Sequence, residues 1–131
     1  MDFFDQGETA VVTGAGNGIG RAIAQALVKE GVDTIFVELK PDTLADAVAG
    51  SCDGPGRAIA WQGDLAQRSE CERLLAQAQT ELGHIDMFVH SASPPRSEKD
   101  HIFAVSDDTW RQMHAVNVDA SFYLCREFSR A

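Results

Sequence analysis

The sequence has few of the residues that hold small folds together covalently or through a metal ion. It contains 3 cysteines in 131 residues, at positions 52, 71 and 125, and none of them belongs to a CxxC spacing. An odd number of scattered cysteines predicts neither a disulfide framework nor a zinc site. We therefore expect no metal site and three isolated thiols that are buried or half-exposed, as free cysteine usually is.

Long apolar runs and positive charge are scarce as well. No stretch approaches the roughly 20 apolar residues that cross a bilayer, and the N-terminal MDFFDQGE is acidic where a signal peptide would be basic. The formal net charge of -9 creates a field that repels nucleic-acid phosphates and anionic lipid headgroups. These features predict a cytoplasmic protein that has neither nucleic acid nor membrane as a partner.

The sequence does contain a regular alternation of strand-like and helix-like segments. Hydrophobic residues make up 44% of the chain, which is enough for one core. Apolar runs rich in β-branched and aromatic residues predict strands at 9–13, 33–38, 57–62 and 85–90, and segments of helical periodicity separate them. This order predicts one α/β domain over residues 1–131, a Rossmann-type doubly wound parallel sheet truncated after about four strands.

The segments between and after the strands predict four helices. The buried stripe expected for the first helix, from offsets of three and four, is Ile19, Ala22, Ile23, Ala26 and Leu27. The stripe expected for the third helix is Cys71, Leu74, Leu75, Ala78 and Leu82. Gly31 and Gly83 supply helix ends, a shorter second helix is expected at 41–49, and Ser106 is the expected N-cap of the fourth. A long loop at 91–105 follows the fourth strand, where α/β sheets bind ligands.

A glycine-rich segment, TGAGNGIG at 13–20, joins the first strand to the first helix. Its backbone amides and the helix N-terminus form a site suited to a pyrophosphate. Glycine permits the tight turn, the close approach of the phosphates and the packing of helix on strand. The alternative is a glycine-rich turn without a ligand. Gly14, Gly18 and Gly20 give the spacing GxxxGxG, which differs from the GxGxxG of the ordinary dinucleotide fold.

This spacing, preceded by a threonine, resembles the cofactor loop of the short-chain dehydrogenases/reductases. The resemblance extends from residue 8 to about residue 128. It implies an oxidoreductase that transfers hydride between NAD and a small-molecule alcohol or carbonyl substrate. The cofactor contacts that it implies in the loop are Gly14, Asn17, Gly18, Ile19 and Gly20.

Glu38 ends the second predicted strand, where an acidic side chain can accept hydrogen bonds from the adenosine ribose hydroxyls. A carboxylate there would repel a 2′-phosphate. Asn17 and Leu39 are uncharged, so neither position offers the cation that such a phosphate needs. We therefore predict a preference for NAD over NADP. The alternative is a solvated glutamate at the end of a strand.

The resemblance assigns roles to further positions. Asp64 and Leu65 match the pair that contacts the adenine in the family, although an aspartate there also suits the start of a turn. Ser91 and Ala92 lie where the family lines the nicotinamide ribose. Asn117, within AVNVDASF, matches the asparagine that joins the family's catalytic proton relay through water; the alternative is a purely structural asparagine.

The turn after the fourth strand departs from the family pattern. Relatives usually have Asn-Asn-Ala-Gly, whereas this chain has His-Ser-Ala-Ser at 90–93. We interpret His90 as a neutral structural residue, because a lone histidine without a paired carboxylate is more often a satisfied core group; a titrating catalytic group is the alternative. Ser93 occupies a backbone position that the family fills with glycine.

The family's catalytic tyrosine and lysine, spaced YxxxK, have no counterpart in this sequence. Tyr123, the single tyrosine, is followed at that spacing by Glu127, and the lysines stand at 29, 40 and 99. We therefore expect the cofactor-binding half of a protein about twice as long, with the catalytic half absent and no activity of its own. The resemblance also implies a homo-oligomer in the full-length form. The alternative is a non-catalytic dinucleotide-binding or interaction module.

Overall fold

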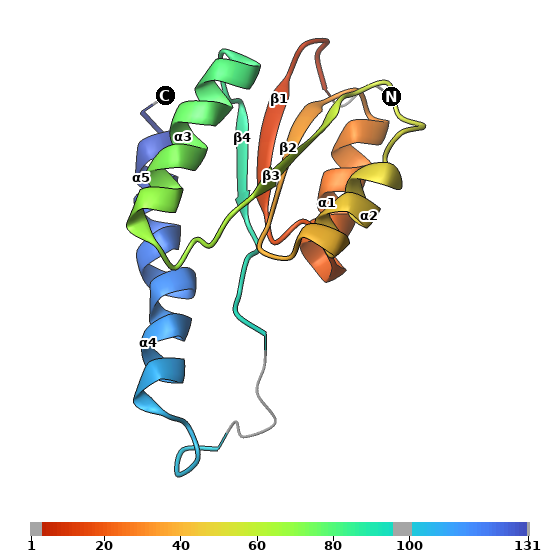
Figure 1. Cartoon of the computed structure of the whole chain (residues 1–131). Coiled ribbons are helices and arrows are strands. Elements are labelled where there is room, and N and C mark those ends of the chain that lie inside the picture. Colours follow the sequence, from red (N-terminus) through yellow and green to blue (C-terminus); the bar gives the residue numbers. More distant parts are fainter. Residues whose placement is uncertain (1–3, 96–100, 131) are drawn as a thin grey trace.

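The computed structural model describes residues 4–95 and 101–130, and its centre is a parallel sheet (Figure 1). The strands are β1 (Thr9–Thr13), β2 (Asp33–Glu38), β3 (Ala58–Gln62) and β4 (Met87–His90). They lie in the order β3-β2-β1-β4, and each neighbouring pair is parallel. The predicted class, a Rossmann-type parallel α/β sheet with four strands, is confirmed.

Two strands begin later than the sequence predicted. The predicted start of the third strand was residue 57, and that of the fourth was residue 85. The backbone N–H of Arg57 donates to the carboxylate of Asp33 at 2.8 Å, while the carbonyl of Arg57 still accepts the N–H of Thr34 at 2.8 Å. Before β4, the carboxylate of Asp86 accepts the N–H of Thr9 at 2.8 Å in the same way. At the amino ends of both strands, side-chain bonds to the backbone therefore accompany the first main-chain bonds of the sheet.

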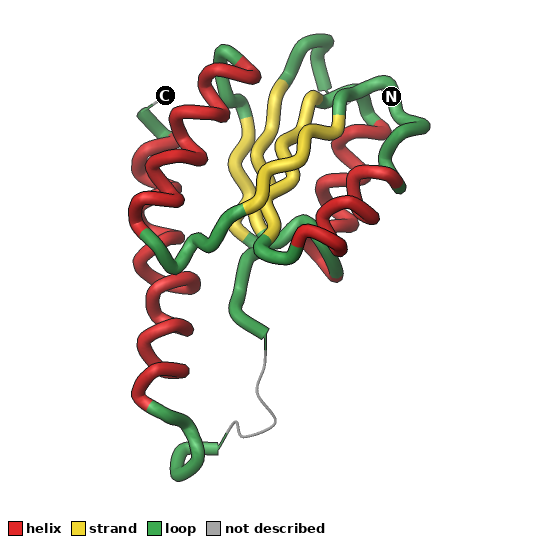
Figure 2. Tube along the Cα trace, viewed as in Figure 1, coloured by secondary structure: helices red, strands yellow, loops and turns green. Residues whose placement is uncertain are grey.

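Helices cover both faces of the sheet. The helices of the chain are α1 (Gly18–Lys29), α2 (Pro41–Ala49), α3 (Arg68–Leu82), α4 (Asp107–His114), the π-helix η1 (Ala115–Ala120) and α5 (Ser121–Phe128), and α4 extends beyond the sheet (Figure 1). Figure 2 shows the strands between two groups of helices, with α1 and α2 on one side and α3 and α5 on the other. Within the described residues, no helix combines the length and the apolar character needed to cross a membrane.

The predicted buried face of α1 is wrong, because the helix is rotated about its axis relative to the prediction. Its buried residues are Gly20, Ala24, Leu27 and Val28. Of the predicted stripe only Leu27 is buried and Ile23 is partly buried, whereas Ile19, Ala22 and Ala26 are exposed. A Cβ atom on Gly20 would lie 2.2 Å from the carbonyl oxygen of Gly14, so the helix presents its smallest residue to the preceding loop. This close approach, which hydrophobicity does not encode, sets the rotation of α1.

The other helix predictions are largely confirmed. Cys71, Leu74, Ala78 and Leu82 are the buried residues of α3, and Leu75 is partly buried against them. Gly31 and Gly83 follow helices with φ of +95° and +75°. The Oγ of Ser106 accepts the N–H of Thr109 at 3.1 Å, as expected of an N-cap. After α4, the π-helix η1 continues directly into α5, so the three segments form one continuous rod.

The core on the α3 and α5 side contains the single tyrosine. Tyr123 is 8% exposed and packs in one cluster with Leu74 and Leu124. The guanidinium carbon of Arg68 lies 3.2 Å from the centroid of the Tyr123 ring, so a cation–π contact covers its face. Tyr123 is therefore a packing residue of the core.

The three cysteines should differ sharply in reactivity. Cys71 is buried on α3, and burial raises the pKa of its thiol to about 11, whereas Cys52 and Cys125 are exposed. We expect iodoacetamide at about pH 8 to alkylate Cys52 and Cys125 in the folded protein and to spare Cys71. Mass spectrometry of the intact chain and of its peptides measures this, with the denatured chain as the fully labelled control. Equal labelling of Cys71 and Cys52 in the folded state would contradict the buried position.

Candidate functional site

The sheet order creates a crevice at one end of β1. The chain proceeds from β1 through β2 to β3 on one side, and then returns to place β4 on the other side of β1. At such a switch point the connections leave the strands in opposite directions, and ligands bind in the gap outside the carboxyl ends. Thr13 and His90, the last residues of β1 and β4, are register partners there.

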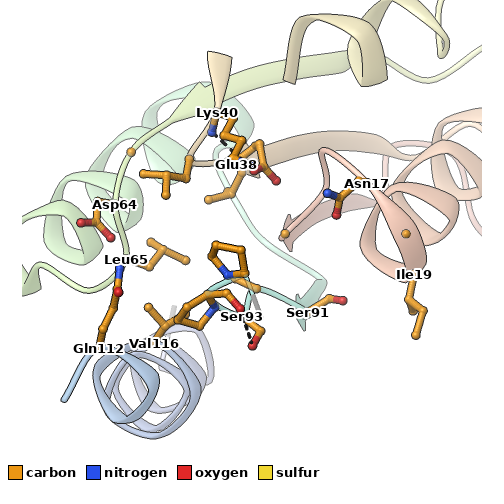
Figure 3. Close-up of a pocket in the computed structure, with 18 residues that line it drawn as sticks. Asn17, Ile19, Glu38, Lys40, Asp64, Leu65, Ser91, Ser93, Gln112 and Val116 are labelled. Carbon is orange, nitrogen blue, oxygen red and sulfur yellow. Dashed lines mark hydrogen bonds between the residues drawn. The ribbon is translucent and has the colours of Figure 1, made fainter. Parts of the chain in front are cut away.

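A pocket of about 460 Å³ opens at this switch point (Figure 3). Its walls come from the glycine loop, the ends of β2 and β3, the segment after β4, and the α4 and η1 helices. The lining residues are Gly14, Asn17, Gly18, Ile19, Val37, Glu38, Leu39, Lys40, Gly63, Asp64, Leu65, Ser91, Ala92, Ser93, Pro94, Pro95, Gln112 and Val116.

The structure brings the predicted cofactor residues together, with one exception. All of them except Gly20 line the pocket. Gly20 is buried behind the loop, where it packs on Gly14. Asn117, the residue predicted for a proton relay, is exposed in η1 and is not among the lining residues, although Val116 beside it is. Its catalytic role stays a prediction.

Glycine is required in the loop for two different reasons. Gly14 has a φ of +67°, and a Cβ atom on it would lie 2.8 Å from backbone atoms of Ser91 and Ala92. Gly18 has a φ of +56°, but a Cβ atom there would meet no protein atom within 4 Å. Gly14 thus permits contact within the protein, and Gly18 keeps open the space in front of the α1 N-terminus.

The N-terminus of α1 presents uncompensated positive charge to the pocket. Its N-cap, Asn17, is extended and makes no side-chain capping bond, and the first turn contains no acidic residue. The first N–H groups of a helix have no partner within the helix, and the helix dipole adds a partial positive charge. This end of α1 therefore suits an anionic group such as a phosphate.

Glu38 lies at the edge of the pocket and folds over the glycine loop. Its carboxylate accepts the N–H of Gly16 at 3.0 Å and the N–H of Lys40 at 3.4 Å. A Cβ atom on Gly16 would lie 2.6 Å from the Glu38 side chain, so this third glycine makes room for the carboxylate. Lys40 also lines the pocket; the sequence prediction considered Asn17 and Leu39 and missed this cation one position further on.

The opposite side of the pocket combines a turn and a helix face. Asp64 accepts the N–H of Ala66 at 3.0 Å, so it does start the turn, and it also lines the pocket beside the buried Leu65. Gln112 and Val116 face the same space from α4 and η1 (Figure 3). The sequence prediction missed both, although their separation of four residues places them on one helical face.

Ser91 and Ala92 form the floor of the pocket, and a hydrogen-bond network links this floor to β1, β4 and η1. The hydroxyl of Thr13 accepts the N–H groups of Ser91 and Ala92, each at 3.1 Å, and lies 3.0 Å from Nδ1 of His90. Nε2 of His90 lies 3.0 Å from the carbonyl oxygen of Val116. A carbonyl can only accept, so Nε2 carries the proton, and Nδ1 accepts the single proton of the Thr13 hydroxyl.

A neutral His90 imidazole with its proton on Nε2 therefore satisfies all of these partners. Burial lowers the pKa of this imidazole, and the bond to Val116 opposes that effect without reversing it. This arrangement agrees with the interpretation of His90 as a structural residue. The imidazole joins β4 to β1 and η1.

Fold and pocket together define a class. A parallel α/β sheet with a glycine loop between β1 and α1, and a pocket at the switch point beside it, is the architecture of dinucleotide-binding proteins.

Comparison with known proteins gives the family. The family model described as short chain dehydrogenase matches residues 8–131, so this chain belongs to the short-chain dehydrogenase family. The hydroxyacyl-CoA dehydrogenase ChsB1 of Mycobacterium tuberculosis is 34% identical over 125 residues, covering 92% of this chain and 38% of the relative. The 3beta-hydroxysteroid dehydrogenase of Mediterraneibacter gnavus is 31% identical over 127 residues, covering 97% and 45%.

Solved structures agree with the fold. The L-sorbose reductase of Gluconobacter frateurii, complexed with NADPH and L-sorbose, superposes with a TM-score of 0.87 at 26% identity, over 99% of this chain and 49% of that protein. A short-chain dehydrogenase/reductase from Brucella melitensis gives 0.85 at 31% identity, over 100% and 55%. The chain thus spans about half of the structures, and less than half of the curated relatives, that it matches.

Proposed function

We propose that this chain binds a nicotinamide dinucleotide and is the cofactor-binding half of an oxidoreductase. The whole protein would transfer hydride between NAD and a small-molecule alcohol or carbonyl compound. The observation that carries the proposal is the open glycine cradle at the α1 N-terminus, with the Glu38 carboxylate at the edge of the same pocket. The dehydrogenase and reductase names of the relatives support the reaction class.

The residues present fit such a cofactor. The space in front of Gly18 and the free amides of α1 would hold the pyrophosphate. Glu38 would accept the adenosine ribose hydroxyls, and Asp64 and Leu65 would contact the adenine. Ser91 and Ala92 would line the nicotinamide ribose. When bound, the nicotinamide ring supplies or accepts the hydride.

Two side chains favour opposite cofactors, and we propose that Glu38 decides for NAD. Its carboxylate is held in place by Gly16 and would repel a 2′-phosphate at the ribose. Lys40 could attract that phosphate and so favour NADP. Two similar solved structures, with NADPH and NADP bound, also favour NADP. The fixed position of the carboxylate is the reason to rank Glu38 above a flexible lysine.

Replacing Glu38 by glutamine tests this preference. Glu38→Gln keeps an acceptor for the Gly16 N–H but removes the charge, so NADP should gain about tenfold in affinity relative to NAD. Calorimetric titration of the unaltered chain and of Glu38→Gln with NAD and with NADP measures the ratio of the two affinities. Asp42→Asn, which removes an exposed carboxylate from α2 outside the pocket, is the matched control and should leave the ratio unchanged. Tighter binding of NADP than NAD by the unaltered chain would refute the preference.

Catalysis by this chain alone is not part of the proposal. The sequence contains no YxxxK, and Tyr123 is held in the core under Arg68 rather than in the pocket. Asn117 would contribute to a proton relay only together with a tyrosine and a lysine supplied from elsewhere. We expect no NADH formation from simple alcohols by the 131-residue chain.

A second candidate is a non-catalytic dinucleotide-binding module, for which the cofactor pocket alone would suffice. An in-frame YxxxK in the coding sequence beyond codon 131 would favour the oxidoreductase, and a stop codon at that point would favour the module. Both candidates share the cofactor pocket.

We propose that the whole protein is a cytoplasmic homo-oligomer. The exposed Val118 and Phe122, on the outer surface of η1 and α5, provide apolar area for a contact between its copies.

A further inference from the structure

His90 links the elements behind the pocket, and its partners extend to the pocket itself. It stands at the end of β4 where relatives have an asparagine, and it does not line the pocket. Yet its two nitrogens reach the Thr13 hydroxyl and the Val116 carbonyl, each at 3.0 Å. Val116 itself is part of the pocket wall, and Thr13 holds the N–H groups of Ser91 and Ala92 in the pocket floor. The imidazole therefore contacts the pocket wall at Val116 directly and the pocket floor through Thr13, from the side away from the pocket.

The Thr13 hydroxyl has no spare hydrogen-bonding capacity. A hydroxyl has one proton and two lone pairs. The proton goes to Nδ1 of His90, and the lone pairs accept Ser91 and Ala92. This arrangement is possible only while Nδ1 lacks a proton, which is the tautomer that the Val116 bond selects.

Protonation of His90 would break this arrangement. Both ring nitrogens would then be donors, so the Thr13 oxygen would have to accept Nδ1–H and release one of the two amides. The Ser91 N–H also bonds the Thr13 carbonyl at 3.3 Å, which makes the Ala92 bond the more vulnerable one. Ala92 packs directly on Gly14, so its displacement would also reach the glycine loop.

We infer that His90 is a positioning residue that couples the shape of the cofactor pocket to pH. In its neutral form it fixes the Ser91–Ala92 floor and the Val116 wall; in its protonated form it releases the floor and weakens dinucleotide binding. The binding part of this inference rests on the proposed function, whereas the coupling within the protein does not.

The surroundings of His90 give the direction of the effect. The groups that face the imidazole are the Thr13 hydroxyl from β1, the Val116 carbonyl from η1 and the Phe88 ring from β4, whose centroid lies 6.3 Å away. In the described part of the chain, no charged side chain contributes to its pKa, which burial lowers. The unfolded chain therefore takes up the proton first. Stability should fall as the pH drops from about 6.5 toward the lowered pKa of the folded state.

Two variants separate the two bonds of the imidazole. The side-chain amide of His90→Asn reaches as far as Nδ1 and can keep the Thr13 bond, and that of His90→Gln reaches as far as Nε2 and can keep the Val116 bond. Neither amide titrates, so both variants should lose the pH dependence even if they differ in stability. His101→Asn, which removes an exposed histidine, is the control that should keep it.

The experiment has two readouts on the 131-residue chain. Nuclear magnetic resonance follows the His90 tautomer and the amide signals of Ser91 and Ala92 from about pH 7.5 down to about pH 4.5, because the lowered pKa of the imidazole places its titration below about 6.5. Calorimetry measures NAD affinity over the same range, with an expected loss of about tenfold at the acidic end, the equivalent of one hydrogen bond. The expected result is an Nε2–H tautomer of His90. The amide signals of Ser91 and Ala92 should shift with pH at the same midpoint as the His90 titration, and these shifts should be absent in His90→Asn and His90→Gln.

The outcomes distinguish this inference from the proposed function. Amide shifts at Ser91 and Ala92 without any NAD binding would support the coupling and refute the proposed function. NAD binding whose pH dependence is the same in the unaltered chain and both His90 variants would overturn the role of His90. An Nδ1–H tautomer, or a His90 titration that leaves both amide signals unmoved, would overturn it as well.

Discussion

Gly20→Ala is expected to destabilise the protein by about 3 kcal/mol, although alanine is the better helix former. The added Cβ atom would lie 2.2 Å from the carbonyl oxygen of Gly14 and 2.8 Å from its carbonyl carbon. These are backbone atoms, so relief requires α1 to move away from the loop. That movement would also displace the amides that face the pocket, and dinucleotide binding should be lost. Urea unfolding measures the first effect and calorimetry the second.

Gly18→Ala is the matched control for this change. Gly18 lies in the same loop and has a φ of +56°, but its added Cβ atom would meet open space. Its effect on stability should come from backbone strain alone, a destabilisation of about 1 kcal/mol. If the two substitutions reduced stability equally, the contact between Gly20 and Gly14 would not be the reason for glycine at position 20.

Thr13→Val should destabilise the protein by about 3 kcal/mol while preserving the shape of the side chain. Thr13 is fully buried at the end of β1, and valine is at least as favourable in a strand. Its hydroxyl, however, forms hydrogen bonds with the N–H groups of Ser91 and Ala92 and with Nδ1 of His90. Valine would leave buried polar groups without partners, and the pocket floor should lose its fixed position. Unfolding free energy and NAD affinity should both fall.

Thr34→Val distinguishes this network from the general effect of losing a buried hydroxyl. Thr34 is equally buried in β2, but its hydroxyl donates to one carbonyl, that of Val32, at 3.1 Å. We expect a change of about 1 kcal/mol and unaltered NAD affinity. Thr13→Ser, which retains the hydroxyl, should recover most of the affinity. Similar losses for Thr13→Val and Thr34→Val would argue against a special role for the network.

Much of the fold was predictable because it depends on neighbours in sequence. Short apolar runs gave the strands, the offsets of Cys71, Leu74 and Ala78 gave the buried stripe of α3, and Ser106 marked a helix start. The same reasoning failed for α1. Its exposed Ile19 looks like a core residue by hydrophobicity, but it lines the pocket, and the smaller Gly20 and Ala24 are buried instead.

The sequence by itself determined the succession of strands and helices along the chain and the glycine loop. It also determined that Glu38 ends a strand and that Asp64 and Ser91 follow strands. Each of these follows from local backbone preferences or from residues close in sequence. Only the tertiary structure decided that Gln112 and Val116 complete the pocket and that Lys40 lines it beside Glu38. It also decided the partners of His90, because Thr13 and Val116 lie 77 and 26 positions away in the sequence and reach the imidazole only when β4 pairs with β1 and η1 lies beside it.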